Sequence, residues 1–214
     1  MKLKTLLFSA LTVFFATNVN AQIKKGSIFL GGSINFASEK TDPPGAPGFQ
    51  TQKQNTFGVS PAVGKAVKDN LIVGIEANFF TREYYGSGPD FSGNEKMAGG
   101  AFFARKYAPL GKNFYLFGHG SLGAGWQKTS YRNGGTSGKN EGYNIGLNFY
   151  PGLAYSVTSR LQLEAAMPSF LYASYTNLDP GNGIHKRTFS AGTAFSNFSG
   201  INIGVRILLN KAGN

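Results

Sequence analysis

Few residues of this chain can do ionic or acid–base chemistry, and five of them lie inside segments that are otherwise apolar or small. They are Glu76, Arg105, His119, Glu164 and Arg206. Carboxylates and guanidinium groups that share one interior are expected to pair, because an unpaired buried charge is far more costly. The same set would suit a gated path for protons or ions, which would require a continuous file of water. We expect the paired arrangement, an interior polar network.

A second candidate for chemistry is the pair His119 and Ser121, in the segment FGHGSLG. A hydroxyl beside an imidazole is the usual arrangement of a nucleophile and its base. No asparagine follows Ser121, and Glu76 and Glu164 are the only carboxylates that could orient the histidine. We therefore expect no catalytic residue. The other histidine, His185, has no companion at zinc-ligand spacing, so we expect no metal and no cofactor.

Composition excludes several classes of protein. Glycine accounts for 30 of the 214 residues and charged residues for only 14%; because glycine costs about 1 kcal/mol per helix position, a long helical protein is not expected. A hydrophobic fraction of 41% is too high for a disordered chain. The absence of cysteine excludes disulfides, thiolate metal sites and cysteine nucleophiles. The net charge of +11 is scattered, so we expect no nucleic-acid partner.

Residues 1–21 are predicted to be a cleavable signal peptide. Two lysines precede an apolar run at 6–16, and a small-x-small cleavage site ends at Ala21. The apolar run is too short for a spanning helix, which needs about 20 residues. The mature chain, 22–214, is therefore expected to be exported and to be either soluble or a membrane β-barrel.

The dominant hydrophobic period of the mature chain is two, as in β-strands with two unlike faces. Eight segments alternate in this way: 26–36, 56–67, 71–80, 99–107, 114–126, 143–157, 161–167 and 198–209. Short turns are predicted at 68–70, 109–113 and 158–160, and long polar loops at 37–55, 81–96, 127–142 and 174–190. Short turns at one end and long loops at the other are typical of outer-membrane barrels. Pro61 and Pro151 conflict with central strands unless a bulge accompanies each.

The five ionisable residues share their face with glycine and serine, whereas the opposite face is nearly all apolar. A soluble barrel would place the apolar face inside, and a lipocalin-like fold is the alternative to a membrane barrel. We expect the apolar face to meet lipid, because it would otherwise expose bare aliphatic side chains to water. On that face, Lys65 and Lys106 are placed to reach lipid headgroups. An outer aromatic girdle is predicted at the loop ends, formed by Phe36, Phe57, Phe79, Trp126 and Tyr143.

The chain resembles the small outer-membrane β-barrel proteins of Gram-negative bacteria, the OmpA/OmpX/OmpW-like family, over essentially all of 22–209. The segments that carry the resemblance are KKGSIFLGGSINF, TFGVSPAVGKAVKDNLIVGIEANF, FFARKYAPLGKNFYLFGHGSLGAG, FYPGLAYSVTSRLQLEAA and SGINIGVRILL. The resemblance implies an all-β, eight-stranded, antiparallel up-and-down transmembrane β-barrel with short periplasmic turns and long extracellular loops. It also implies that the N-terminus of the barrel lies in the periplasm.

These observations predict an integral outer-membrane protein that is not an enzyme, is a monomer, and contacts outer-membrane lipid. Its interior is expected to be filled, since large residues would obstruct a channel: Phe29, Phe80, Phe103, Tyr115 and Phe117. Its function is then expected to lie in the loops, in adhesion or in binding an extracellular ligand or protein. Exposed aromatic residues there favour contacts: Phe49, Tyr84, Tyr85, Phe91, Tyr131 and Tyr175.

Two alternatives remain open from the sequence. The first is porin-like transport of small solutes through a narrow lumen. The second is a lipid-modifying enzyme that uses His119 and Ser121, a pair similar to that of outer-membrane lipid A deacylases. The second would require His119 to face lipid, whereas the alternation places it inside.

Overall fold

The computed structural model describes residues 23–41, 51–86, 91–111, 113–167, 170–180, 185–193 and 202–209. The predicted signal peptide, Phe49 and residues 194–201 lie outside these ranges. Within them the chain is all-β and antiparallel, as predicted. The described part contains no helix that is long and apolar enough to cross a membrane.

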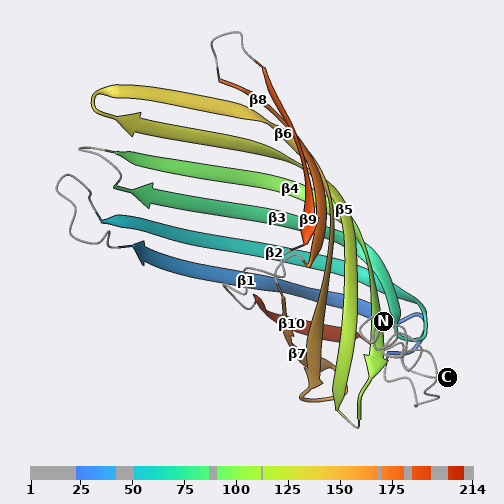
Figure 1. The fold of residues 1–214 in the computed structure, drawn as a ribbon. Helices are drawn as coiled ribbons and strands as arrows, with labels where there is room; N and C mark the ends of the chain where they lie inside the picture. The colour runs from blue at the N-terminus through green and yellow to red at the C-terminus, as the bar shows by residue number, and fades with distance from the viewer. Residues whose placement is uncertain are drawn as a thin grey trace, which may run out of the picture.

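Ten strands are present in the described residues. Their bounds are β1 (Ile28–Thr41), β2 (Gln52–Lys68), β3 (Leu71–Tyr85), β4 (Ser92–Pro109), β5 (Phe114–Asn133), β6 (Thr136–Ser156), β7 (Leu161–Ala166), β8 (Leu171–Asp179), β9 (Lys186–Thr193) and β10 (Asn202–Leu209). Each strand from β1 to β6 pairs with its neighbours in sequence, β6 pairs with β7, β7 with β10 and β10 with β1. The pairings of these eight strands therefore form a closed ring. Figure 1 shows β1 to β4 running side by side before the sheet curls through β5 and β6.

The strands extend well beyond the apolar segments that predicted them. β5 and β6 reach Asn133 and Thr136, where Gly134 and Gly135 both have positive φ and close a two-residue turn. The predicted long loops are wrong to this extent, because backbone pairing continues where the outer face has become polar. The interval 174–190, predicted to be a loop, holds most of β8 and of β9.

This change moves most of the predicted loop aromatics onto strands. Tyr84 and Tyr85 end β3, Tyr131 lies on β5, and Tyr175 lies on β8. Only Phe91, just before β4, remains outside a strand among those described.

The two prolines are accommodated differently: the ladders of β2 keep their register across Pro61, whereas the partner of β6 changes register by two residues between β7 and β8, beside Pro151. Pro61 pairs with Gly32 of β1, while the β2–β3 ladder skips Ser60 and Pro61 and resumes at Ala62 in the same register. Because proline has no backbone N–H, the gap in the ladder leaves no unpaired donor at Pro61. Pro151 of β6 lies where β7 gives way to β8, and its carbonyl accepts a hydrogen bond from Met167 N (3.1 Å). The interruption between β7 and β8 therefore coincides with the missing donor of Pro151.

The two faces of the ring are unlike in the predicted sense. On β3, Val73 and Ile75 are 39% and 52% exposed, whereas the side chain of Glu76 is only 13% exposed. Leu71, also expected outside, is half-buried beside the turn. We call the half of the ring nearest the short connections β2–β3, β4–β5 and β6–β7 the turn half, and the opposite half the loop half. The buried apolar residues form a cluster in the turn half: Ile23, Phe29, Ala66, Ile72, Phe103, Tyr107, Tyr115, Phe117, Ala154, Ala166 and Leu208.

Inside the ring, large side chains lie directly over glycines of the neighbouring strand. Phe103 is paired with Gly74 and Phe117 with Gly152. A Cβ added at Gly74 would lie 2.8 Å from the Phe103 ring, and one at Gly152 would collide with the Phe117 ring. A narrow ring can hold large aromatic residues only if the facing positions are small. The glycines of the turn half thus make room for the aromatic core.

We expect Gly152→Ala to lower the free energy of unfolding by about 1–3 kcal/mol, because the added methyl group meets both the Phe117 ring and Ala165 O (2.8 Å). The control is Gly120→Ala on the outer face, where the nearest atom lies 4.0 Å away and the change should stay within about 0.5 kcal/mol. Urea unfolding of the refolded protein measures both. Equal effects of the two substitutions would contradict the packing described here.

Candidate functional site

The interior of the turn half contains one carboxylate held by two arginines. Arg105 Nη1 donates to both carboxylate oxygens of Glu164, at 2.8 and 2.6 Å, and Arg206 Nε lies 3.0 Å from Oε2. Tyr107 donates its hydroxyl to Oε1 at 2.7 Å. The side chains of Arg105 and Glu164 are each only 2% exposed. Arg206 also donates through Nη1 to the carbonyl of Gly32, so β4, β7, β10 and β1 are joined across the ring.

His119 connects this cluster to the second interior carboxylate. Arg105 Nε donates to His119 Nδ1 at 3.1 Å, so Nδ1 is the acceptor and the neutral ring carries its hydrogen on Nε2. Nε2 lies 3.6 Å from Glu76 Oε2 and has no hydrogen-bond partner among the described residues. Glu76 is therefore separated from Arg105 by an imidazole ring.

Aromatic rings enclose the charged groups. The Arg105 guanidinium lies 4.6 Å from the centre of the Phe117 ring and 5.4 Å from that of Phe29, distances suited to cation–π attraction. His119 is stacked between Phe103, at 5.1 Å, and Tyr150, at 4.5 Å between ring centres. The rings exclude water from the ion pairs and fill the cross-section at this level.

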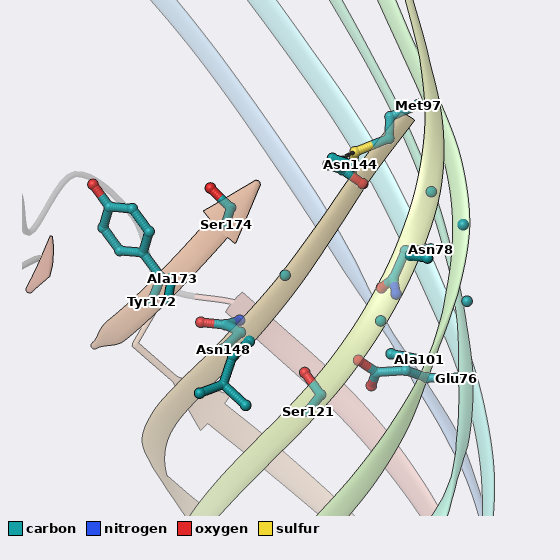
Figure 2. A pocket seen from close by; sticks show the side chains of 17 residues that line it. Glu76, Asn78, Met97, Ala101, Ser121, Asn144, Asn148, Tyr172, Ala173 and Ser174 are labelled. Atoms are coloured by element: carbon teal, nitrogen blue, oxygen red, sulfur yellow. Dashed lines mark hydrogen bonds between the residues drawn. The ribbon is translucent and has the colours of Figure 1, made fainter. Parts of the chain in front are cut away.

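Above this cluster, towards the loop ends, the interior opens into a cavity of about 350 Å³. We call it the upper cavity; Glu76 and Ser121 lie at its lower end, and Figure 2 shows their oxygen atoms turned into it. Asn78, Asn144 and Asn148 line it at higher or neighbouring levels of β3 and β6. Much of the remaining wall is glycine or alanine: Gly99, Gly100, Ala101, Gly123, Ala124, Gly125, Gly146 and Ala173.

The structure thus brings together all five residues predicted for the interior network. Glu164 with Arg105 and Arg206 forms its charged centre, and His119 and Glu76 extend it to the upper cavity. Of the residues predicted to obstruct a channel, Phe29, Phe103, Tyr115 and Phe117 are buried, whereas Phe80 is half-buried nearer the loops.

His119 and Ser121 also point inward and are both buried. A lipid-modifying enzyme would need this pair on the outer face, where its substrate would lie. Among the described residues, no group of three or more His, Asp or Glu side chains is placed to hold a metal ion.

The residues predicted for the girdle lie within two residues of one another in cross-strand register on the outer face. Phe36 is paired with Phe57, and Trp126 is paired with Tyr143 and with Ala98, which is paired in turn with Phe79. All five aromatic side chains are exposed. Beyond this level the outer face becomes polar, with Lys96, Lys128 and Glu141 next along their strands.

The interior network predicted from the sequence omits three members of the interior: Tyr107, Tyr150 and Gln162. The alternation places Tyr107 on the same face as Arg105, and Gln162 on the same face as Glu164, each two residues away. Tyr150 lies next to Pro151, where the sequence pattern does not clearly assign residues to one face of the strand.

No family model matches the chain, and no curated protein matches it. Among solved structures it is similar to Neisserial surface protein A, at 16% identity, TM-score 0.42, covering 86% of this chain and 99% of that one. It is similar to a major outer membrane protein from Thermus thermophilus, at 10% identity, TM-score 0.47, with coverages of 86% and 99%. It is also similar to Ail, the attachment invasion locus protein of Yersinia pestis, at 15% identity, TM-score 0.39, with coverages of 86% and 95%. These TM-scores are below 0.5, so the functional argument rests on the residues of this chain.

We expect Glu164→Gln to destabilise the protein by about 3–5 kcal/mol, because it removes the charge that both buried arginines share. The control is Glu141→Gln, which removes the partner of Lys128 at 3.5 Å on the solvated part of the strands and should change stability far less. Both free energies are measured by urea unfolding. Similar values for the two variants would show that the interior cluster is not a buried ion-pair network.

Proposed function

We propose that this chain is an integral outer-membrane protein whose eight-stranded barrel is formed by β1–β7 and β10, with β8 and β9 extending the wall towards the loops. Its interior is closed by the Glu164 cluster, and it acts through the surface of its loop end. The observation that carries the proposal is the inverted distribution of side chains: Ile, Leu, Val and Phe outside, and Arg105, Glu164 and His119 buried inside.

The dimensions of the apolar outer face support a membrane location. On β5 it runs from Phe114 to Trp126, which corresponds to about 40 Å along the strand. At the usual tilt this is about 30 Å along the barrel axis, close to the apolar band of about 25 Å with its aromatic borders. β5 continues for seven residues beyond Trp126, to Asn133. The hairpins therefore project beyond the lipid.

The projecting hairpins carry a surface suited to binding. Tyr85 and Tyr131 are exposed there, and Tyr85, Ser92 and Arg132 line two adjoining cavities of about 500 and 350 Å³. Tyrosine and arginine are the residue types that most often dominate binding surfaces. Cross-strand ion pairs such as Arg82–Glu95 (3.2 Å) hold the hairpins in register. We therefore place adhesion or ligand binding on this rim.

We expect Ile75→Arg to cost about 2–4 kcal/mol of stability in a bilayer, because Ile75 lies at the middle of the apolar face of β3. Tyr85→Arg, on the same face but beyond the aromatic level, should cost only about 0–1 kcal/mol. Reversible unfolding from lipid vesicles measures both. If Ile75→Arg is as mild as an ordinary surface substitution, the apolar face does not contact lipid.

The filled cross-section also predicts that the protein conducts no ions. Because Phe29, Phe103 and Phe117 are at most 4% exposed, no continuous water file passes their level. In planar bilayers we expect no single-channel steps from the purified protein. A general porin added afterwards should produce steps, which shows that the bilayer reports pores. Reproducible steps before that addition would favour porin-like transport instead.

A further inference from the structure

The upper cavity has the chemistry of a site for a small organic cation. Of its described lining residues only Glu76 carries a charge, and the other polar groups are amides and hydroxyls. The cavity volume of about 350 Å³ lies within the range of small-molecule sites. We propose that this cavity binds a small primary ammonium ion, with its charge against Glu76 and its carbon chain along the alanine and glycine wall.

The carboxylate of Glu76 is free to take such a partner. Both arginines of the interior bind Glu164, at 2.6 and 3.0 Å. The closest charged or ionisable partner of Glu76 among the described residues is His119, whose Nε2 lies 3.6 Å away, beyond a normal hydrogen bond. The imidazole thus faces one side of the carboxylate, and no cation of the described lining lies on the side turned to the cavity.

Other acceptors line the same cavity. The register places Glu76 level with Gly123, Gly146 and Ser174, and places Ser121 level with Asn148. Asn148 Oδ1 is buried and has no hydrogen-bond partner among the described residues. An ammonium group has three donors and no acceptor, so it matches a cavity lined by a carboxylate, by the unpaired amide oxygen of Asn148 and by serine hydroxyls. An anion would find no cation in the described lining, and a neutral alcohol would leave the charge of Glu76 uncompensated.

Methionine provides a local probe for the test. The chain has three methionines, of which Met97 lines the cavity and Met167 does not. Methyl-¹³C-methionine protein, refolded in detergent micelles, is titrated separately with n-butylammonium, n-butanol and butyrate. We expect a saturable shift of the Met97 methyl signal with n-butylammonium alone, and no shift of Met167. A Met97 shift of the same size with n-butanol would overturn the proposal, as would the lack of a saturable shift with all three.

Two variants distinguish the contribution of the Glu76 charge from that of the cavity volume. Glu76→Gln should weaken binding of n-butylammonium about tenfold or more, because it removes the charge from the pairing. Gly146→Leu should abolish it by filling the cavity, since an added Cβ there meets nothing closer than Ala173 O at 3.6 Å. Gly120→Leu places the same side chain on the outer face and should leave binding unchanged.

Each variant is checked for folding by the Met167 signal and by its migration on gels with and without heating. A folded Glu76→Gln or Gly146→Leu protein that binds as tightly as the original would contradict the site. This outcome is distinct from failure of the membrane proposal, because the upper cavity requires only the ring of strands together with β8, and not their contact with lipid.

Discussion

The structure depends on burying Glu164 between Arg105 and Arg206. Removing any one of these charged groups from water without a partner would cost several kcal/mol of free energy. The attraction between the paired charges offsets this cost only when the geometry is good and further hydrogen bonds are made. Tyr107, the carbonyl of Gly32 and the rings of Phe29 and Phe117 supply those contacts. Glu164 lies on β7 and Arg105 on β4, so their ion pair connects strands that are not neighbours in the ring, while Arg206 lies on β10, beside β7. The charges therefore select one closed arrangement of the sheet.

The division of the interior into a filled and an open half follows from residue size. In the turn half, aromatic rings lie over Gly74 and Gly152 and leave no space. In the loop half, the facing positions at Ala101, Gly123 and Gly146 are all small, and among the described residues no aromatic ring supplies one of the nearest atoms to a Cβ added at Gly123 or Gly146. The same small residue type thus serves packing at one level and produces a cavity at another. Glu76 lies at the boundary between these halves, in contact with the cluster through His119 and with the cavity directly.

Much of this could be predicted from the alternation of residue types. The period of two placed Ile75 outside and Glu76 inside, and it grouped Arg105, His119, Glu164 and Arg206 on one face before any contact was known. The alternation gave no strand prediction where the strands extend beyond the apolar part of the outer face. Beyond Phe79 and Trp126 both faces are polar, so Tyr85 and Tyr131 were assigned to loops although their backbones remain paired. The segment 161–167 was predicted to end where β7 ends, but β8, which pairs with β6 beyond Pro151, was missed because most of it was assigned to the loop 174–190. The upper cavity depends on cross-strand register, which no single segment specifies.

The central claim is that the apolar face of the sheet contacts hydrocarbon while the ionic face does not. The chain has no cysteine, so single cysteines can be introduced for spin labels without altering others. Labels at Val73, Ile75 and Phe79 of the protein in bilayers are predicted to be relaxed strongly by oxygen and weakly by a water-soluble nickel complex. A label at Asn78, on the interior face, is predicted to show the reverse order relative to these sites. Strong relaxation of the Val73, Ile75 and Phe79 labels by the nickel complex would contradict the account.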